Sequence, residues 1–357
     1  HRSRVGKQGS RPGCERFKPP YLQGHRGPKV IMKRPAFWDA PGVTWQSFLL
    51  SPASLIYGIG RLLHVSLLKA GRTSVPLICV GNVTAGGAGK TPVVLDLGAR
   101  LLKTGRAVHF LSRGYGGRTF GPKLIAPDRH TAVEVGDEPL LLARTAPTWV
   151  AADRLSGARI AAREGAQVVI MDDGFQSPRL IKDLSFLIFD GDSGIGNGAL
   201  LPAGPMREPL GIALRRAQAA VIIGDDRHNL ARYIPKRITV FQADMVPIRP
   251  MSDTPGRVVA FAGIGRPEKF FQTLAKAGYD LADTVAFPDH SLFADSELAD
   301  LRARAKHHGA QLITTEKDFV RLTPMERKGI AVMRILLRWR DETALDQFLA
   351  DQLNFGD

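Results

Sequence analysis

Short apolar runs alternate with helical or loop stretches along most of this chain. Six of them lie at 75–80, 107–111, 148–151, 167–171, 185–189 and 219–223. Runs of this length, bounded by turn residues, are typical of buried strands. Because strands that alternate with helices form parallel sheets covered on both faces, the pattern predicts an α/β fold.

A second, smaller pattern of the same kind follows. Its strands and helices are expected at 258–262, 267–277, 283–287, 295–308 and 311–314. Between the two patterns, from Asp225 to Gly256, the composition shifts toward Arg, Pro and Asp. We therefore predict four segments: an extension at 1–31, a first α/β domain at 32–225, a linker at 226–257 and a smaller C-terminal α/β domain at 258–357.

The segment 45–69 has helical periodicity with one apolar stripe. The stripe consists of Phe48, Pro52, Leu55, Ile56, Ile59, Leu62, Leu63 and Leu67, while Ser47, Ser51, Ser54 and Arg61 lie mostly off it. Pro52, the glycines and Arg61 argue against a transmembrane span, which needs about 20 uninterrupted apolar residues. Two interpretations stay open. The helix either packs in the core, or lies at a membrane interface with Trp45, Arg61, Lys69 and Arg72 near headgroup depth.

The formal charge of +15 is concentrated at the beginning of the chain. Residues 1–31 contain eight Lys or Arg and one acid, Glu15, so they supply +7 of it. They are rich in Gly, Pro and Arg without hydrophobic periodicity, and we expect them to be disordered. They have no apolar signal-peptide core, and Met32 begins an ordinary sequence, so we interpret 1–31 as an extension foreign to the working protein. A basic nucleic-acid-binding arm is the alternative.

The composition is otherwise that of an ordinary globular protein. The length of 357 residues is enough for about two domains, and 44% of the residues are hydrophobic and 23% charged. Cys14 and Cys79 provide neither a disulfide framework nor a metal cluster, and a reducing compartment fits them.

The stretch 77–92 is the strongest candidate for chemistry. It reads Leu-Ile-Cys-Val-Gly-Asn-Val-Thr-Ala-Gly-Gly-Ala-Gly-Lys-Thr-Pro, a strand followed by a glycine loop and a helix that begins near Lys90. Backbone N–H groups of such a loop and the helix N-terminus bind phosphates, while the lysine reaches the β- and γ-phosphates. The hydroxyl of Thr91 is placed to hold Mg²⁺. Thr84 stands where the strict pattern has its first glycine, so an ordinary glycine-rich turn is the alternative.

Paired acids end another predicted strand. Asp172 and Asp173 follow the apolar run 167–171, the arrangement of a Walker B motif, in which a carboxylate holds Mg²⁺ directly or through water. The alternative is a strand-end turn formed by the Asp-Gly pair. Other polar groups at predicted strand ends are Ser112-Arg113 and Asp190-Gly191-Asp192, and ligands of parallel sheets collect at such ends.

Three other nucleotide-binding classes fit the sequence less well. A regulatory ATPase with a deviant Walker A loop needs a first lysine where this chain has Ala85, and a GTPase needs an Asn-Lys-x-Asp motif where it has Thr315-Glu-Lys-Asp318. Gly263 and Gly265 hint at a dinucleotide turn, but Glu268 occupies the third glycine position. A nucleic-acid-binding function rests on net charge alone.

Seven motifs together resemble one family, the tetraacyldisaccharide 4′-kinases, which are the lipid A 4′-kinases of Gram-negative bacteria. They occur in family order over about residues 32–345, and they are Gly81-Asn-Val-Thr-Ala-Gly-Gly-Ala-Gly-Lys-Thr-Pro92, Leu111-Ser-Arg-Gly-Tyr-Gly-Gly117, Val135-Gly-Asp-Glu-Pro-Leu140, Asp172-Asp-Gly-Phe-Gln176, Leu201-Pro-Ala-Gly-Pro-Met-Arg-Glu-Pro209, Phe287-Pro-Asp-His290 and Thr314-Thr-Glu-Lys-Asp318. Ser177, where many relatives carry His, and residues 1–31 depart from the family pattern.

The resemblance implies a P-loop kinase with ATP and Mg²⁺ as cofactors. Its reaction would be transfer of the γ-phosphate to the 4′-hydroxyl of tetraacyldisaccharide 1-phosphate, giving lipid IVA in lipid A biosynthesis. This places the protein peripherally on the cytoplasmic face of the inner membrane and favours membrane contact for 45–69. We expect a monomer that binds no nucleic acid.

The resemblance also implies roles for individual residues. The catalytic residues would be Lys90, Asp137 and His290, with Asp137 as the base and His290 orienting it. ATP phosphates would be held by Thr84, Ala85, Gly86, Gly87, Ala88, Gly89, Lys90 and Thr91. Candidate Mg²⁺ ligands are Thr91, Asp172, Asp173 and Glu208. Candidate contacts of the lipid substrate are Asn82, Arg113, Glu138, Gln176 and Arg207.

Overall fold

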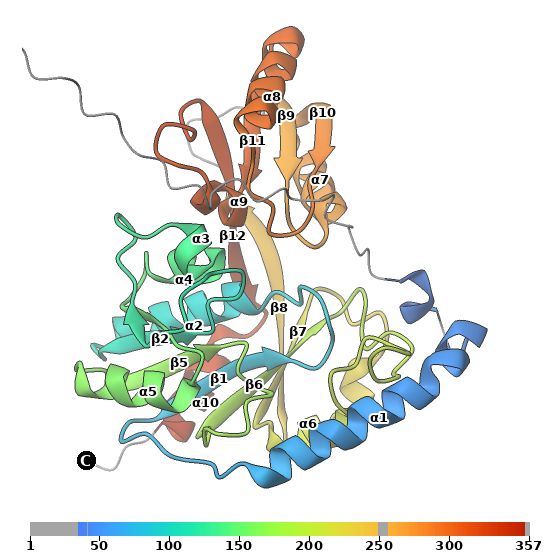
Figure 1. Ribbon diagram of the computed structural model, residues 1–357, viewed down its shortest axis with the longest axis vertical. Coiled ribbons are helices and arrows are strands. Elements are labelled where there is room, and N and C mark those ends of the chain that lie inside the picture. The colour runs from blue at the N-terminus through green and yellow to red at the C-terminus, as the bar shows by residue number, and fades with distance from the viewer. Residues whose placement is uncertain (1–34, 41, 249–255, 354–357) are drawn as a thin grey trace, which may run out of the picture. The chain divides into compact units, whose positions relative to one another are not determined.

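The computed structural model describes residues 35–40, 42–248 and 256–353 (Figure 1). Its strands are β1 Leu77–Asn82, β2 Val108–Ser112, β3 Lys123–Leu124, β4 Thr148–Val150, β5 Val168–Asp172, β6 Leu184–Asp190, β7 Ala219–Ile223, β8 Thr239–Ile248, β9 Arg257–Ala262, β10 Asp280–Ala286, β11 Gln311–Thr315 and β12 Ile330–Trp339. Its helices are η2 Ala36–Trp38, α1 Trp45–Leu67, α2 Lys90–Lys103, α3 Ala132–Val135, α4 Asp137–Leu142, α5 Arg154–Arg163, α6 Leu210–Arg216, η3 Leu230–Tyr233, α7 Pro267–Lys276, α8 Asp295–His308, α9 Glu316–Arg321 and α10 Glu342–Gln352. The expectations for residues 1–31 fall outside the described residues.

The predicted α/β fold is confirmed. Among the described residues, twelve strands form one sheet in the order β10-β9-β11-β12-β8-β7-β6-β1-β5-β2-β4-β3. Around β1 the strands are parallel, with β5 on one side and β6 on the other. The carboxyl ends of β1, β2, β5 and β6 therefore lie at the same edge of the sheet, where parallel sheets bind their ligands.

The buried strand β1 is covered on both faces because its side chains alternate between two cores. Ile78 and Val80 pack with α2 and α10 in one apolar cluster. Leu77 and Cys79 pack with α5 and α6 in another. This arrangement explains why the run 75–80 is apolar without interruption: neither face of the strand is exposed to water.

The segment 226–257 is not a simple linker, and this expectation was wrong. It contains β8, which pairs in parallel with β7 and antiparallel with β12. The strand β12 is long enough to pair with two partners, β11 through Ile330–Met333 and β8 through Arg334–Trp339. The two α/β patterns are thus joined by a continuous sheet, and residues 33–357 form one compact unit. Sequence periodicity missed both strands because only one face of each is buried.

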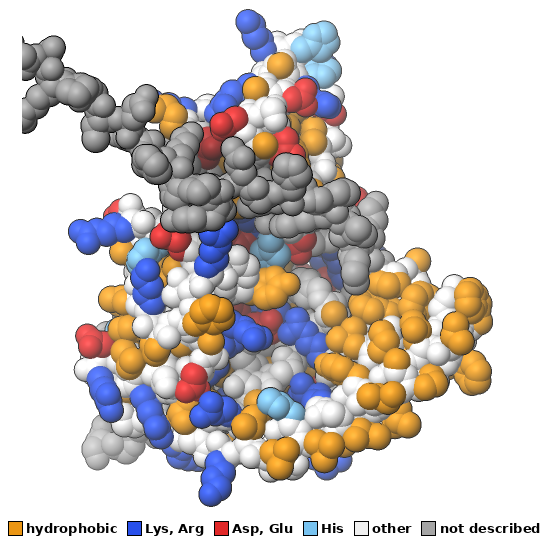
Figure 2. Space-filling model, in the orientation of Figure 1, with side chains coloured by type: hydrophobic (Ala, Val, Ile, Leu, Met, Phe, Trp, Pro, Cys, Tyr) orange, Lys and Arg blue, Asp and Glu red, His pale blue; other side chains and the backbone are white. Residues whose placement is uncertain are grey.

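The helix α1 places its polar side inward and its apolar stripe outward. Ser47 and Ser54 are buried, and the hydroxyl of Ser54 donates to the carbonyl of Leu200. The exposed side chains include Trp45, Phe48, Leu49, Leu55, Ile56, Ile59, Leu62, Leu63 and Leu67, each 49% to 81% exposed. Figure 2 shows these hydrophobic side chains as a continuous surface along the helix. The core interpretation of 45–69 is therefore wrong.

Candidate active site

The glycine loop between β1 and α2 has the local geometry of a phosphate-binding turn. Gly89 adopts a left-handed conformation, with φ of 78°, directly before the helix begins at Lys90. A Cβ atom at Gly89 would lie 2.1 Å from Cε of Met245 and 2.7 Å from Cδ1 of Ile223, so another residue would have to displace these side chains as well as adopt the left-handed backbone that favours glycine. The loop therefore turns sharply into the N-terminus of α2, where free N–H groups favour anions.

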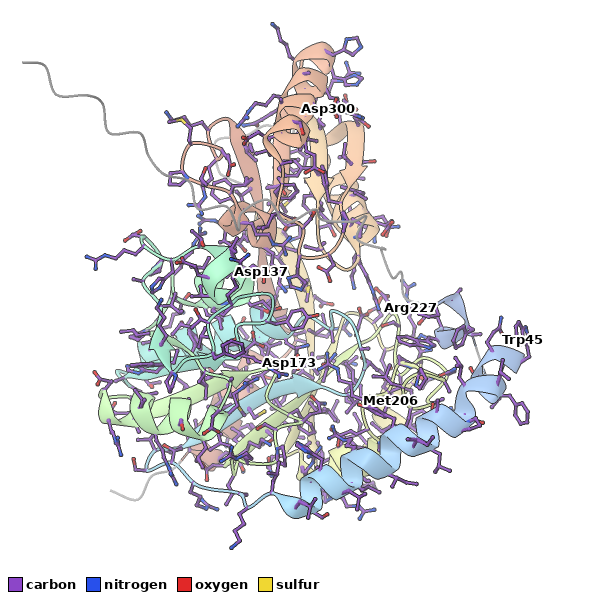
Figure 3. The ribbon with its side chains drawn as sticks, viewed as in Figure 1. Trp45, Asp137, Asp173, Met206, Arg227 and Asp300 are labelled. Carbon is purple, nitrogen blue, oxygen red and sulfur yellow. The ribbon has the colours of Figure 1, made fainter. Side chains whose placement is uncertain are left out.

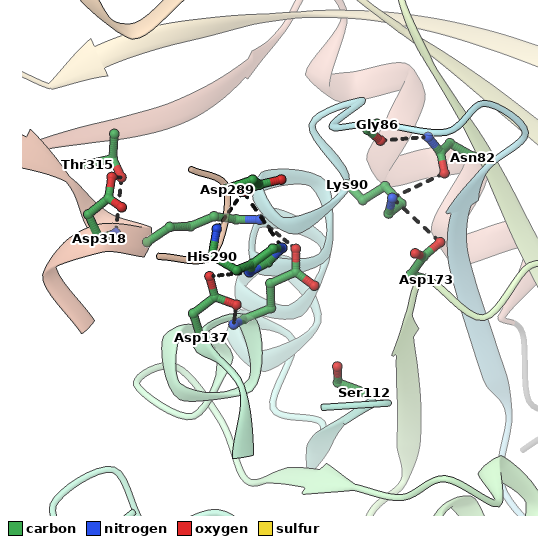
Figure 4. Close-up of polar contacts among 12 residues, drawn as sticks. Asn82, Gly86, Lys90, Ser112, Asp137, Asp173, Asp289, His290, Thr315 and Asp318 are labelled. Atoms are coloured by element: carbon green, nitrogen blue, oxygen red, sulfur yellow. Dashed lines mark hydrogen bonds and ion pairs between the residues drawn. The ribbon is translucent and has the colours of Figure 1, made fainter. Parts of the chain in front are cut away.

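Asn82 supports this loop from inside. It is fully buried, and its side-chain amide donates to the carbonyls of Thr84 and Gly86 at 2.8 and 3.4 Å. Its Oδ1 accepts a hydrogen bond from Nζ of Lys90 at 3.1 Å (Figure 4). We predicted a substrate contact for Asn82, but the side chain is committed to shaping the loop and orienting its lysine.

Other loop residues are held by the segment 201–209. The backbone N–H of Ala85 donates to the carbonyl of Pro205, and Thr84 forms a bridge with Met206. Thr91, in the first turn of α2, is buried, as is Ala88, while Gly87 has open space where a side chain would be. These contacts bring the motifs Gly81–Pro92 and Leu201–Pro209 together.

Asp172 is a buried carboxylate that lacks a hydrogen-bond partner. It ends β5 beside Val80 of β1, it is 1% exposed, and neither of its oxygens is hydrogen-bonded among the described residues. Burial and the neighbouring charge of Glu138 raise the pKa of Asp172 to about 8. A buried acid without partners is costly to fold, and a bound cation is one means of satisfying it.

The residues fit a Mg²⁺ site of the kind that shares its ion with a nucleotide. No group of three or more Cys, His, Asp or Glu in the described ranges forms a metal cluster of its own. Mg²⁺ in kinases is bound by one or two protein oxygens together with phosphate oxygens and water. The carboxylate of Asp172 and the hydroxyl of Thr91 are the two protein groups that remain suited to this role.

Asp173 is paired with two cationic side chains. It has φ of 51°, and both of its oxygens accept from Nη1 of Arg207, at 3.1 and 3.2 Å. Nζ of Lys90 lies 3.5 Å from Oδ1 of Asp173. The pKa of Asp173 is lowered because Lys90 and Arg207 together outweigh its burial. Asp173 and Arg207 were predicted as a Mg²⁺ ligand and a substrate contact, but here they bind each other.

Glu208, predicted as a Mg²⁺ ligand, is bound by arginines in this structure. It is 1% exposed, and its Oε2 pairs with Arg216 and, at 3.1 Å, with Arg61 of α1. Its other oxygen lies 3.3 Å from the side-chain nitrogen of Gln176, which also donates to the carbonyl of Asn82. Glu208 and Gln176 therefore link α1 to the end of β1. Arg61, expected near lipid headgroups, points inward instead.

Asp137 and His290 are brought together from distant parts of the chain. Nδ1 of His290 lies 3.1 Å from Oδ2 of Asp137, as drawn in Figure 4. Asp137, the first residue of α4, is buried and accepts the backbone N–H of Glu138 on Oδ1. The ring of Tyr115 packs edge-on against His290 with centroids 5.3 Å apart. The pair predicted from the sequence thus exists.

A third residue, Arg321 of α9, completes this cluster. Its guanidinium donates to Oδ2 of Asp137 and is as buried as the carboxylate. Burial raises the pKa of Asp137, but the His290 hydrogen bond and the charge of Arg321 outweigh it, so the pKa lies below its ordinary value. The hydrogen bond to Asp137 raises the pKa of His290. The sequence analysis missed Arg321, which lies just beyond the motif Thr314–Asp318.

Glu138 is paired as well. Its Oε1 lies 2.5 Å from Nζ of Lys317, one turn before Arg321 on α9. Lys317 has a raised pKa because the charge of Glu138 outweighs its burial. The helix α9 thus binds α4 through two ion pairs at successive acids. Lys317 lies in the motif Thr314–Asp318, and that position was the sequence signal for a role of this lysine.

Two arginines, Arg113 and Arg154, add positive charge near the paired acids. Arg113 follows β2 and is exposed, whereas Arg154 is buried and donates to the carbonyl of Ala151 at 2.8 Å. Burial and the charge of Arg113 lower the pKa of Arg154 to about 10. Figure 2 shows Lys and Arg side chains around a hollow beside α1. Arg113 was predicted as a contact of the lipid substrate, and its side chain is exposed.

Comparison with known proteins identifies the family of this chain. A family model described as tetraacyldisaccharide-1-P 4′-kinase matches residues 46–354. The tetraacyldisaccharide 4′-kinase of Rhodospirillum centenum is 49% identical over 91% of this chain and 98% of its own length, and that of Gluconacetobacter diazotrophicus is 47% identical over 89% and 97%. The crystal structure of LpxK from Aquifex aeolicus in complex with ATP has a TM-score of 0.71, 28% identity, and coverage of 86% of this chain and 99% of that one. This chain therefore belongs to the tetraacyldisaccharide-1-P 4′-kinase family.

Proposed function

We propose that this protein transfers the γ-phosphate of ATP to the 4′-hydroxyl of tetraacyldisaccharide 1-phosphate, the step of lipid A biosynthesis that yields lipid IVA. The observation that carries the proposal is the Asp137–His290 hydrogen bond at a sheet edge that also bears a phosphate loop. The curated relatives bear the name of this activity, and one solved relative holds ATP. A proton acceptor beside a phosphate cradle suits transfer to a hydroxyl.

The phosphate loop supplies positioning and charge. Its N–H groups and the N-terminus of α2 would hold the β- and γ-phosphates, and Lys90 would neutralise charge that develops on the transferred group. Asp172 and Thr91 would hold Mg²⁺, which supplies further neutralisation of the phosphate oxygens. The contacts of Asn82 and Asp173 keep the ammonium of Lys90 directed to one place.

The geometry supports His290 rather than Asp137 as the group that removes the proton. Oδ2 of Asp137 already accepts from His290 and Arg321, and Oδ1 accepts from a backbone N–H. With Nδ1 of His290 donating to Asp137, Nε2 carries the free lone pair. Nε2 takes the proton of the 4′-hydroxyl, the oxygen attacks the γ-phosphorus, and ADP leaves. We therefore assign Asp137 the task of orienting His290 and stabilising its charged form.

The exposed stripe of α1 supports a peripheral position on a membrane. Among the described residues, α1 is the one helix long and apolar enough to cross a bilayer, which by itself is weak evidence. Its buried serines and its Arg61–Glu208 pair attach it to the protein, so an interfacial position fits better than a span. A four-chain lipid stays in its bilayer, and the enzyme must come to it, at the cytoplasmic face where ATP is available.

The test is a phosphate-transfer assay with radiolabelled ATP and the disaccharide lipid in detergent micelles. We expect lipid-dependent transfer that requires Mg²⁺. The matched variants are Asp137→Asn and His290→Gln, which should each lower turnover by about two to four orders of magnitude while ATP still binds. ATP hydrolysis without lipid phosphorylation, or DNA binding that falls with salt, would refute the proposal.

A further inference from the structure

We propose that Arg321 is a positioning residue that fixes both members of the Asp137–His290 pair at once. The inference rests on the proposed function, because it concerns the proton acceptor of that reaction. It assigns to a residue of α9 a task that neither the phosphate loop nor the paired acids perform. Figure 3 labels Asp137, which lies just below the part of the molecule where Figure 1 places α9.

Every part of the Arg321 guanidinium has an acceptor. Nε and Nη2 donate to Oδ2 of Asp137, and Nη1 donates to Oδ1 of Asp318 at 2.8 Å and to the carbonyl of Gly263 at 2.7 Å. The side chain is 2% exposed, and both acids are equally buried. The planar guanidinium has five N–H donors in fixed directions, so it can reach all of these acceptors at once, whereas the single ammonium of a lysine cannot.

The carbonyl of Gly263 connects Arg321 to the other member of the pair. This oxygen also accepts the backbone N–H of His290 at 3.1 Å. The N–H of Gly263 donates to Asp318, so the turn is held on both sides. A Cβ atom at Gly263 would lie 3.2 Å from Oδ1 of Asp318 and 3.3 Å from Nη1 of Arg321, which leaves little room for another residue.

His290 needs this support because its backbone is in an unfavourable region. Its φ is 57°, a left-handed conformation uncommon for residues other than glycine. Such conformations persist where surrounding contacts fix them. The shared carbonyl of Gly263 holds the backbone of His290, and the shared Oδ2 of Asp137 holds its ring. One guanidinium therefore sets the direction of Nε2 from two sides.

Arg321 also sets the charge around the imidazole. The groups that face His290 are Asp137 from α4, Asp289 from its own turn, Arg321 from α9, and the uncharged ring of Tyr115. The two acids favour the protonated ring, whereas burial and, to a smaller extent, the charge of Arg321 favour the neutral ring. A base must be neutral to accept a proton, so Arg321 extends activity toward lower pH.

The test compares Arg321→Lys and Arg321→Gln with a control, Arg327→Gln. Arg327 also supports α9, since it donates to the carbonyls of Phe319 and Val320, but none of its hydrogen bonds reaches Asp137. We measure kcat, KM for ATP, the pH dependence of kcat and thermal unfolding. Arg321→Lys loses the fork geometry, so it should lower kcat about 10- to 100-fold. Because it keeps the charge, the acidic limb of its kcat–pH profile should stay within a few tenths of a pH unit of the parent's.

Arg321→Gln loses the charge as well, so the acidic limb of its kcat–pH profile should move to higher pH. KM for ATP should stay within about twofold in both variants, because the phosphate loop is untouched, and Arg327→Gln should keep the parent's limb. If Arg321→Gln does not fold, Arg321→Lys alone decides. The inference would be overturned by a parental kcat in Arg321→Lys. It would also be overturned if the acidic limb of Arg321→Gln moved no further than that of Arg327→Gln.

The Asp137→Asn and His290→Gln variants separate this inference from the proposed function. Loss of transfer in those two variants with parental behaviour of both Arg321 variants refutes only the role of Arg321. Parental transfer in Asp137→Asn and His290→Gln refutes the proton acceptor itself.

Discussion

Nζ of Lys90 lies 3.5 Å from Oδ1 of Asp173, so the lysine of the phosphate loop is ion-paired with the second of the two acids that follow β5. The side chains come from the first turn of α2 and from a residue in the left-handed conformation. Because Arg207 binds the same carboxylate, Asp173 remains neutralised when Lys90 turns to a phosphate. The first acid, Asp172, is thereby left as the one suited to Mg²⁺.

Replacing Lys90 tests the role of the phosphate loop. Lys90→Ala should lower turnover by about two to three orders of magnitude, because it removes positive charge from the developing transition state. Lys103→Ala is the matched control, since Lys103 lies exposed at the other end of α2. Turnover is measured by phosphate transfer, with circular dichroism to verify folding. Near-parental turnover in a folded Lys90→Ala protein would remove the phosphate loop from the mechanism.

Two buried aspartates, at the ends of the strands β5 and β6 that flank β1, should respond oppositely to the same change. Asp172 has no hydrogen-bond partner among the described residues, whereas Asp190, at the end of β6, pairs with Arg266 at 2.8 Å. Asp172→Asn should leave the unfolding temperature unchanged or higher, because it removes a buried unpaired acid, and lower transfer by at least about a hundredfold. Asp190→Asn should lower the unfolding temperature, because it leaves Arg266 without its carboxylate. Equal destabilisation by both would contradict this assignment.

The Asp137–His290 pair should act as one unit. In a double-mutant cycle on kcat, removing both side chains should cost little more than removing either one, because cooperating groups are strongly non-additive. The raised pKa of His290 means that the ring is protonated at higher pH than an ordinary imidazole. Since the protonated ring cannot accept a proton, kcat should fall with decreasing pH from above about 6.5. Additive losses would show that the two residues act separately.

Glu208 should matter for stability rather than for the metal. Glu208→Gln leaves Arg61 and Arg216, which are partly exposed, without their shared carboxylate, and losing charged hydrogen bonds of this kind costs about 1–3 kcal/mol in the free energy of unfolding. The Mg²⁺ concentration that gives half-maximal transfer should stay unchanged. Chemical denaturation and a Mg²⁺ titration check the two statements. A rise in the required Mg²⁺ concentration would restore Glu208 to the metal set.

The stripe of α1 should bind membranes without supporting the fold. Leu55, Ile59 and Leu62 are 65%, 49% and 59% exposed, so replacing all three with Ser should change the unfolding temperature little. Binding to phosphatidylglycerol-containing vesicles should weaken strongly, because burying each such side chain in lipid is worth roughly 1.5–3 kcal/mol. Sedimentation with vesicles measures this. Unfolding of the variant, or unchanged vesicle binding, would refute the interfacial role.

The sequence by itself determined the central part of the fold. The uninterrupted apolar run that became β1, followed by Gly89 and Lys90, has one compact solution: a buried strand, a tight turn and a helix whose N-terminus faces outward. It also pointed to Asp137 and His290, but only because both lie in motifs that resemble those of the tetraacyldisaccharide 4′-kinases. These features are local, so a few neighbouring residues suffice to encode them.

Periodicity did not find β8 and β12, whose side chains are only partly buried along much of their length. The join between the two α/β patterns depends on their mutual pairing, and strand pairing is a contact between segments far apart in the chain. No window of sequence contains both partners, so the expected linker was misplaced.

Tertiary structure also decided which charged groups are free to act. Asn82, Asp173 and Glu208 were plausible ligands by residue type, but each is bound by another side chain: Asn82 by Lys90 of the same loop, and Asp173 and Glu208 by Arg207 and Arg61 of other segments. Asp172, in the same motif as Asp173, is left without one. A side chain's chemistry in a protein depends on burial and on the charge that faces it, and both are set by residues brought close only when the chain folds.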